Sequence, residues 1–300
     1  MIIITGTKRS GTSMWMQILI GAGYPIIGEA FPMRWEKTIK AANPEGFYES
    51  HLRRGIYFRT NPHPKTGTYL FPEQVAHHAV KVFIPGLVRS DRAFIGKVIA
   101  TVREWREYES SIRRLYAIED ESRRAEGKGA FIPVERMPGA LEWWGENFAL
   151  VRDIAVRRYP VHVQTYEGLL AEPERVIRDV IKWLGRGDAD KALAAVKPEH
   201  RTQNRPPSDS VEPEIAEVFD TFYAAMHAGK GLDAPLLQKL NDTNDVLAPR
   251  IAQIHQRLRE QNRKRLAARA KFQREQAAAG KPVAPDDSTH EDDETAEEAV

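Results

Sequence analysis

A group of basic and hydroxyl side chains near the N-terminus has the composition of an anion-binding site. It lies in the segment Gly6-Thr7-Lys8-Arg9-Ser10-Gly11-Thr12-Ser13. Lys8 and Arg9 supply positive charge, and the hydroxyl groups supply hydrogen-bond donors. The two glycines allow successive backbone N–H groups to point at one anion. This combination favours the binding of a phosphate or a sulfate.

The residues on either side of this segment predict the elements that would position it. Ile2–Thr5 is rich in β-branched residues and is typical of a strand buried on both faces. Thr12–Ile20 has a helical pattern, and a helix that begins at Thr12 adds the positive end of its dipole to the loop. The sequence therefore predicts a strand, an anion-binding loop and a helix in succession.

The spacing of the loop excludes some nucleotide sites. Gly6-x4-Gly11 fits the first half of the nucleoside-triphosphate P-loop, which continues with Lys and then Ser or Thr. Here Thr12 stands at the lysine position, and the apolar segment Ala93–Val102 is followed by Arg103 where a magnesium-binding Asp would be expected. A P-loop kinase with a deviant loop is therefore the disfavoured alternative. A dinucleotide fingerprint is excluded because Gly-x-Gly-x-x-Gly does not occur in the loop.

The loop and two later segments resemble one enzyme family. Thr7–Trp15 is similar to the 5′-phosphosulfate loop of sulfotransferases that use 3′-phosphoadenosine 5′-phosphosulfate (PAPS). Val98–Ser111 resembles the strand-to-helix segment of that family, in which an Arg is followed eight residues later by a Ser. These residues are Arg103 and Ser111. An Arg at the end of a strand and a Ser two turns into the next helix can converge on a second phosphate, which would be the 3′-phosphate of PAPS.

Val161–Gly185 resembles a third family segment, and the resemblance implies that Tyr166 lies near the adenine. A core-edge aromatic is the alternative role for this tyrosine. The closing segment of the family resembles Lys197–Arg205, in which Arg201 or Arg205 would reach the nucleotide or the acceptor, or else form a surface salt bridge. The residues that the resemblance assigns to PAPS binding are Thr7, Lys8, Arg9, Ser10, Gly11, Thr12, Ser13, Arg103, Ser111 and Tyr166.

Two further segments, Asn43–Glu49 and Ala79–Ile84, resemble a bacterial sulfotransferase-like pattern and supply candidate catalytic residues. Lys81 interrupts an apolar run, so burial would lower its pKa or require an anionic partner. Glu49 is the first choice for the general base that takes the acceptor proton, and Lys81 would stabilise charge on the sulfonate. Arg9 would stabilise charge on the bridging oxygen. The alternatives are that Glu49 caps a helix and that Lys81 extends from an edge strand to solvent.

The histidines offer a second candidate base and no metal site. His51 is close to Glu49 in sequence and is the next choice for the base. The pair His77-His78 lacks the spacing that would place two ligands on one helical face. We therefore expect no metal, with fixed cations balancing the charge of the transferred group. Sugars, lipids, peptides and small molecules all remain possible acceptors.

Alternation of short strands and helices over residues 1–245 predicts one α/β domain with a three-layer, P-loop-like fold and a central parallel sheet. A non-catalytic sulfotransferase-like binding or structural module is the alternative function for such a domain. The expected strands are Ile2–Thr5, Val80–Ile84, Lys97–Val102 and Val161–Thr165. The expected helices are Thr12–Ile20, Glu107–Glu119, Gly139–Arg157, Pro173–Leu184 and Pro213–His227.

Composition restricts the class of protein. The chain has 300 residues, of which 42% are hydrophobic, enough for one sizeable core and an appendage. It has no cysteine and a net charge of +2, so thiol chemistry is excluded and no global charge indicates nucleic acid. No stretch approaches the roughly twenty apolar residues of a membrane span. These features predict a cytoplasmic protein, in keeping with a PAPS-dependent function.

The C-terminal part of the chain differs from the rest. Residues 246–279 form a basic helical pattern with a thin apolar stripe at Ile251, Ile254 and Leu258. Residues 280–300 are acidic and poor in aromatic residues, which predicts disorder. The basic helix would either contact an anionic partner or remain solvated, with its charge offset by the acidic tail.

Overall fold

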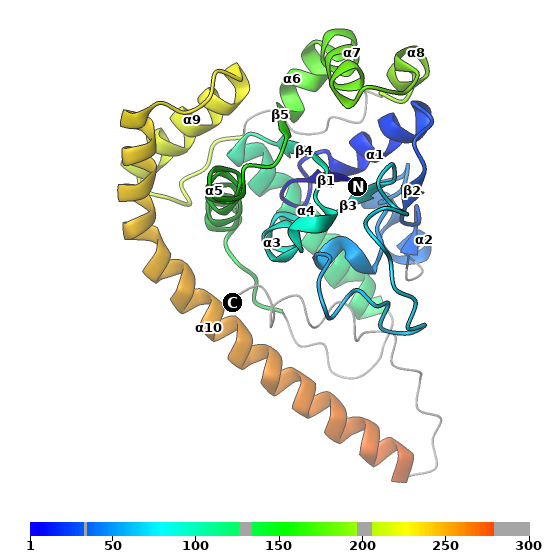
Figure 1. The fold of residues 1–300 in the computed structure, drawn as a ribbon. Helices are drawn as coiled ribbons and strands as arrows, with labels where there is room; N and C mark the ends of the chain where they lie inside the picture. The colour runs from blue at the N-terminus through cyan, green and yellow to red at the C-terminus, as the bar shows by residue number, and fades with distance from the viewer. Residues whose placement is uncertain (33–34, 126–133, 197–205, 279–300) are drawn as a thin grey trace.

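The computed structural model describes residues 1–32, 35–125, 134–196 and 206–278 (Figure 1). Its centre is a five-stranded sheet in the order β2-β3-β1-β4-β5, and all of its strand pairs are parallel. The strands are β1 (Ile2–Thr5), β2 (Ile26–Ile27), β3 (Ala79–Lys81), β4 (Lys97–Val102) and β5 (Val161–Thr165). The fold is therefore α/β, as expected from the alternation of elements.

Helices cover both faces of the sheet. Because side chains alternate between the faces of a strand, Ile2 and Ile4 of β1 pack on one side and Ile3 packs on the other. The first face is covered by α1 (Thr12–Gly21), α7 (Pro173–Leu184) and α8 (Ala189–Leu193). The second is covered by α3 (Ile84–Arg89) and α5 (Gly139–Arg157).

A third hydrophobic cluster lies beyond the sheet, among the longer helices. These are α4 (Trp105–Ala125), α5, α9 (Pro213–Ala228) and α10 (Ala234–Ala278). Aromatic rings fill its centre: Phe219 stacks on Trp144 with ring centroids 4.9 Å apart and meets the ring of Trp105 edge-on at 5.7 Å. This cluster fixes α4 relative to the sheet, and α4 carries one of the predicted phosphate ligands.

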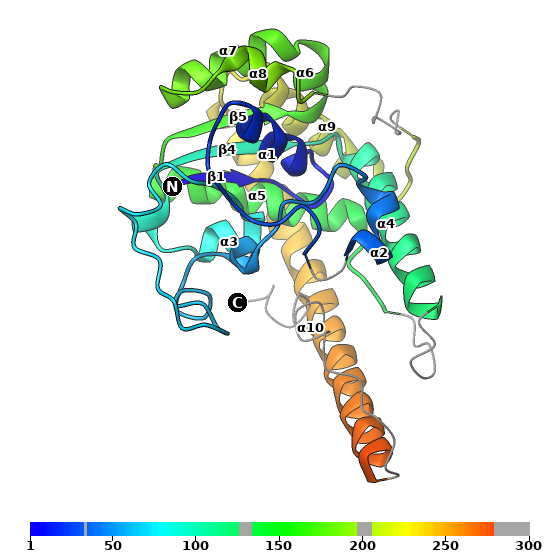
Figure 2. The same cartoon turned by 90° about the vertical axis from the view of Figure 1, so that its right-hand side faces the viewer.

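The remaining described elements are short. They are α2 (Trp35–Thr38), η2 (Lys40–Ala42), η3 (His51–Arg54), η4 (Arg92–Phe94) and α6 (Tyr166–Ala171). Trp35, Ile39 and Phe47 bury one another in a small separate cluster beside α4. Figure 2 shows α2 next to α4.

Several element boundaries differ from the sequence-based expectation. β3 ends at Lys81, and Ile84 starts α3 because Pro85 fits the first helical turn, where its missing N–H costs nothing. α4 begins at Trp105, two residues before the expected start at Glu107, and α6, a short helix directly after β5, was not expected. α10 is one continuous helix from Ala234 to Ala278, through Pro249 and through the expected domain boundary at 245/246. Residues 280–300 lie outside the described part of the chain.

The sheet brings the segments that follow β1 and β4 to one edge. Thr5 pairs with Ala100, so the loop after β1 and the segment after β4 leave the sheet side by side. Parallel sheets bind ligands beyond the carboxyl ends of their strands, where the order of strands reverses, as it does around β1 here. In the described ranges, no helix is both long enough and apolar enough to cross a bilayer.

Candidate anion-binding site

The loop between β1 and α1 is folded tightly against β4. The Ser10 side chain and backbone N–H both donate to the Thr7 carbonyl, at 2.7 and 3.2 Å, and Thr101 Oγ1 donates to the Ser10 carbonyl at 2.7 Å. A Cβ atom on Gly6 would lie 2.4 Å from the Thr101 carbonyl, so only glycine fits there. The predicted loop is therefore preorganised by its own hydrogen bonds and by β4.

Gly11 allows an aromatic ring to contact the start of α1. Its φ angle is +96°, in the left-handed region, and an added Cβ would lie 2.7 Å from Cδ2 of Tyr166. Tyr166 follows β5 directly and is buried. The ring predicted to lie near a nucleotide thus packs against the anion-binding loop.

Arg9, Arg103 and Ser111 converge beside the loop. Arg9 Nε donates to Ser111 Oγ at 3.2 Å, and an Arg103 NH group donates to the Arg9 carbonyl at 3.1 Å. Burial, followed by the nearby charge of Arg103, lowers the pKa of Arg9 to about 10. Two guanidinium groups are thus held together in a desolvated site, a geometry that an anion would stabilise.

Arg103 is held from several sides and still has a donor with no partner. It contacts Glu107 at 3.4 Å, and its guanidinium lies over the ring of Tyr166 at 4.8 Å from the centroid. Trp143 Nε1 donates to its backbone carbonyl at 2.8 Å. Buried polar atoms normally have partners, yet within the described ranges Arg103 Nε has none, and neither has Thr7 Oγ1. A bound oxyanion would satisfy such donors.

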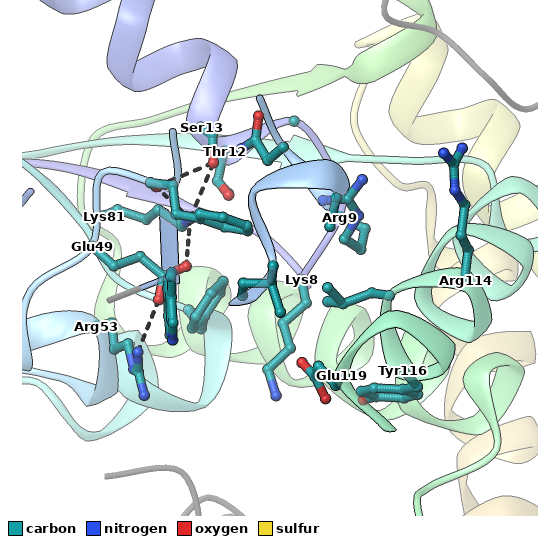
Figure 3. A pocket seen from close by; sticks show the side chains of 18 of the residues that line it. Lys8, Arg9, Thr12, Ser13, Glu49, Arg53, Lys81, Arg114, Tyr116 and Glu119 are labelled. Carbon is teal, nitrogen blue, oxygen red and sulfur yellow. Dashed lines mark hydrogen bonds and ion pairs between the residues drawn. The ribbon is translucent and has the colours of Figure 1, made fainter. Parts of the chain in front are cut away.

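A buried ion cluster lies on the other side of the loop. Lys81 Nζ is 2.7 Å from one carboxylate oxygen of Glu49, and an Arg53 NH group is 3.1 Å from the other (Figure 3). Lys81 also donates to Ser13 Oγ at 3.2 Å and to the Phe47 carbonyl at 2.8 Å. Burial lowers the pKa of Lys81, and Glu49 partly opposes that effect. The anionic partner that a buried Lys81 was expected to require is Glu49.

These groups open into a cavity of about 460 Å³. Most of the predicted residues line it, whereas Thr7 and Ser10 are buried beneath the loop and Ser111 reaches the site through its hydrogen bond to Arg9. The predicted residues on the cavity wall are Lys8, Arg9, Gly11, Thr12, Ser13, Glu49, Lys81, Arg103 and Tyr166.

The candidate histidine is in a different environment. His51 is absent from the described residues that line the cavity, and its ring packs edge-on against His63 with centroids 4.2 Å apart. Arg201 and Arg205 lie outside the described residues. Within the ranges that the structure covers, no group of three or more His, Asp or Glu side chains has an arrangement that could hold a metal ion.

The cavity also has lining residues that the sequence analysis did not select. Arg114 follows Ser111 by three residues on α4, so helical spacing places it near the same face, and that spacing was a usable signal. Arg136 comes from the segment before α5. His255, Leu258 and Arg265 come from α10, and no local pattern in the sequence connects them to the loop.

Comparison with known proteins does not assign the chain to a family. No protein-family model matches the sequence, and no curated protein is significantly similar to it. The function is therefore argued from the site alone.

Proposed function

We propose that this protein is a PAPS-dependent sulfotransferase that transfers the sulfuryl group from PAPS to a hydroxyl or amine. The observation that carries the proposal is the convergence of Arg9, Arg103 and Ser111 beside the loop, through contacts of 3.1 and 3.2 Å. A donor with charged groups at both its 5′ and 3′ positions requires two adjoining anion sites. The loop would be one site, and the Arg103–Ser111 pair would be the other.

The residues present fit such a donor. Arg103 lines the cavity, and its Nε, which has no partner among the described residues, is a donor that phosphate or sulfate oxygens would satisfy. Residues 7–13 would hold the 5′-phosphosulfate, Arg103 and Ser111 the 3′-phosphate, and Tyr166 the adenine. PAPS, when bound, supplies an activated sulfuryl group. Arg9, fixed in the same loop, is placed to stabilise charge on a bridging oxygen.

The buried ion cluster bears on the catalytic roles. Both carboxylate oxygens of Glu49 are engaged, one by Lys81 and one by Arg53. For Glu49 to take a proton from an acceptor, Lys81 must turn toward the sulfonate and release one oxygen. The same movement would bring the positive charge of Lys81 to the sulfonate, whose negative charge it would stabilise. Glu49 lines the cavity, which favours it over His51 as the base.

Calorimetry with 3′,5′-adenosine bisphosphate and with Mg-ATP tests the donor. We expect the bisphosphate to bind more tightly, and we expect Arg103→Ala to weaken it by about a hundred-fold because a charge-assisted contact is lost. Arg175→Ala, which removes an exposed arginine from α7, is the matched control and should leave binding unchanged. Tighter binding of Mg-ATP would favour a P-loop kinase and overturn the proposal.

Transfer itself is tested with labelled PAPS and a metabolite extract. The wild-type chain should label at least one acceptor, Arg9→Ala should not, and Glu49→Ala should be strongly impaired. Bisphosphate binding without any transfer would point to a non-catalytic module instead. Transfer unaffected by Glu49→Ala would remove that residue as the base.

A further inference from the structure

Part of the cavity wall is apolar and comes from two separate hydrophobic clusters. Leu115, Met137 and Leu258 belong to, or pack against, the cluster formed by α4, α5, α9 and α10. Trp35, Ile39 and Phe47 form the small cluster beside α4. We call these six residues the apolar wall. Such a surface in a cavity is suited to an apolar ligand body.

The C-terminal helix is an integral part of this wall. The first half of α10 lies against α5, and its C-terminal end extends away from the body of the protein (Figures 1 and 2). Gln261 Oε1 accepts from the Glu135 backbone N–H at 3.1 Å, which fixes α10 to the segment that carries Met137. His255, Leu258 and Arg265 therefore face the same cavity as the anion-binding loop.

Two arginines beside the apolar wall are paired with carboxylates within the protein. Arg136 is paired with Asp120 at 2.7 Å and with Glu119 at 3.3 Å, and Arg53 is paired with Glu49. Arg265 donates to Asn262 Oδ1 at 3.1 Å. Burial and the neighbouring Arg259 lower the pKa of His255, so its neutral form is favoured at pH 7. Arg114, which also lines the cavity, lies on the side of Arg9, where the donor would bind (Figure 3). With the donor bound, the apolar wall offers little to a charged acceptor.

We propose that the apolar wall is the acceptor subsite and that it selects an uncharged alcohol or phenol with an apolar body. α10 is then a specificity-determining element and not a separate appendage. The term acceptor rests on the proposed sulfotransferase function. The chemical class of the ligand follows from the apolar wall alone. A sugar needs several directional polar partners, and a carboxylate needs an uncompensated cation, whereas the wall presents six apolar side chains.

Calorimetry on the full chain with three probes tests the ligand class. The probes are 2-naphthol, 2-naphthoate and methyl β-glucoside, each measured with and without saturating 3′,5′-adenosine bisphosphate. With saturating bisphosphate, whose negative charges offset the positive excess of the cavity, we expect 2-naphthol to bind at least about ten-fold more tightly than either of the others, because only it is both apolar and uncharged. Equal or tighter binding of the glucoside or the carboxylate would overturn the proposal.

A matched pair of variants on α10 tests the role of the helix. His255→Trp narrows the cavity and should weaken 2-naphthol binding by at least about ten-fold. Ala252→Trp adds the same ring at an exposed position on the same helix and should change binding by less than about two-fold. Both variants should keep the wild-type affinity for the bisphosphate. Should the tryptophan at 255 prevent folding, His255→Phe makes the same test with a smaller change.

The outcomes separate this inference from the proposed function. Unchanged 2-naphthol binding in a folded His255 variant would overturn the role of α10. Bisphosphate binding without 2-naphthol binding would overturn the acceptor subsite and leave the donor site standing. Binding of 2-naphthol without bisphosphate binding would support an apolar subsite and contradict the sulfotransferase.

Discussion

The buried charge of Arg9 makes the free energy of folding less favourable. Arg9 has a φ angle of +67°, which is unfavourable for a residue other than glycine, and it shares a desolvated site with Arg103. Its pKa is lowered to about 10, and the corresponding folding cost is roughly 3 kcal/mol. The charged form is the one penalised, so this cost is fully present below pH 10 and is relieved as pH rises above it.

Arg9→Asn tests whether this strain serves ligand binding. Asn tolerates the left-handed backbone and carries no charge, so the ligand-free variant should melt about 2–5 °C higher than the wild type. Saturating 3′,5′-adenosine bisphosphate should raise the melting temperature of the wild type by at least about 5 °C and that of Arg9→Asn by much less. Thermal unfolding at pH 7 measures both effects. A lower melting temperature with an intact ligand response would contradict the argument.

The Lys81–Glu49–Arg53 cluster poses a different energetic problem, because its charges are compensated by one another. The side chains of Lys81 and Glu49 are only 3% and 6% exposed. Removal of one partner from a buried ion pair leaves an uncompensated charge, whereas removal of both need not.

We therefore expect Glu49→Gln to lower the free energy of unfolding by about 3 kcal/mol and Lys81→Met to have a similar effect. The double variant should be less destabilised than the sum of the two by at least about 1 kcal/mol. Urea denaturation of the four proteins measures the coupling. Strict additivity would show that the two groups do not stabilise each other.

At the scale of elements, α10 is anchored by one apolar face. Leu240, Leu247, Ile254 and Leu258 recur at intervals of seven and four residues and are all buried, so they lie on the same side of the helix. The other described positions of the helix are mostly exposed, and they include many basic residues. Most of the stability of the helix must therefore come from packing of this face and not from helix propensity.

Ile254→Ala should lower the free energy of unfolding by about 2–4 kcal/mol because it leaves a cavity in a packed cluster. Leu266→Ala on the same helix, where the leucine is 40% exposed, should cost less than about 0.5 kcal/mol. Chemical denaturation compares the two variants. Equal, small effects would mean that α10 does not contribute to the core.

The sequence predicted the elements whose signals are local. Ile2–Thr5, Lys97–Val102 and Gly139–Arg157 have their expected bounds, because β-branched runs and helical periodicity are read within a few residues. The two-residue strand β2 gives too short a pattern to recognise. The sequence did not predict that His255 and Leu258 line the cavity. Their position depends on how α10 packs against α5, a long-range property that periodicity does not encode.

The same distinction applies to the site as a whole. The loop residues were found from local composition and spacing, and Arg103 was found from the resemblance of its segment to a sulfotransferase segment. The parallel sheet brings them to one edge. The ion pair of Glu49 with Lys81 joins separate segments, whereas Arg53 is only four residues from Glu49, and only the fold shows that both carboxylate oxygens are engaged. The sequence therefore predicted which residues gather at the site better than it predicted the ion pairs that each of them forms there.

At the scale of the whole molecule, charge is concentrated where the donor would enter. The chain has a net charge of only +2. Among the described residues that line the cavity, however, eight are Lys or Arg and four are Glu, an excess of four positive charges. A cleft with such an excess should attract a polyanion from a distance, and salt should weaken the attraction.

Arg114 and Arg113 provide a test in which the change of net charge is identical. Both are exposed on α4, but Arg114 lines the cavity, whereas Arg113 pairs with Glu109 at 3.6 Å. Arg114→Ala should lower the association rate of 3′,5′-adenosine bisphosphate about three-fold in 50 mM salt and much less in 500 mM salt, since screening removes the steering term. Arg113→Ala should have a smaller effect in both conditions. Stopped-flow measurements of binding compare them, and equal losses in the two variants would attribute the effect to net charge and not to the field of the cavity.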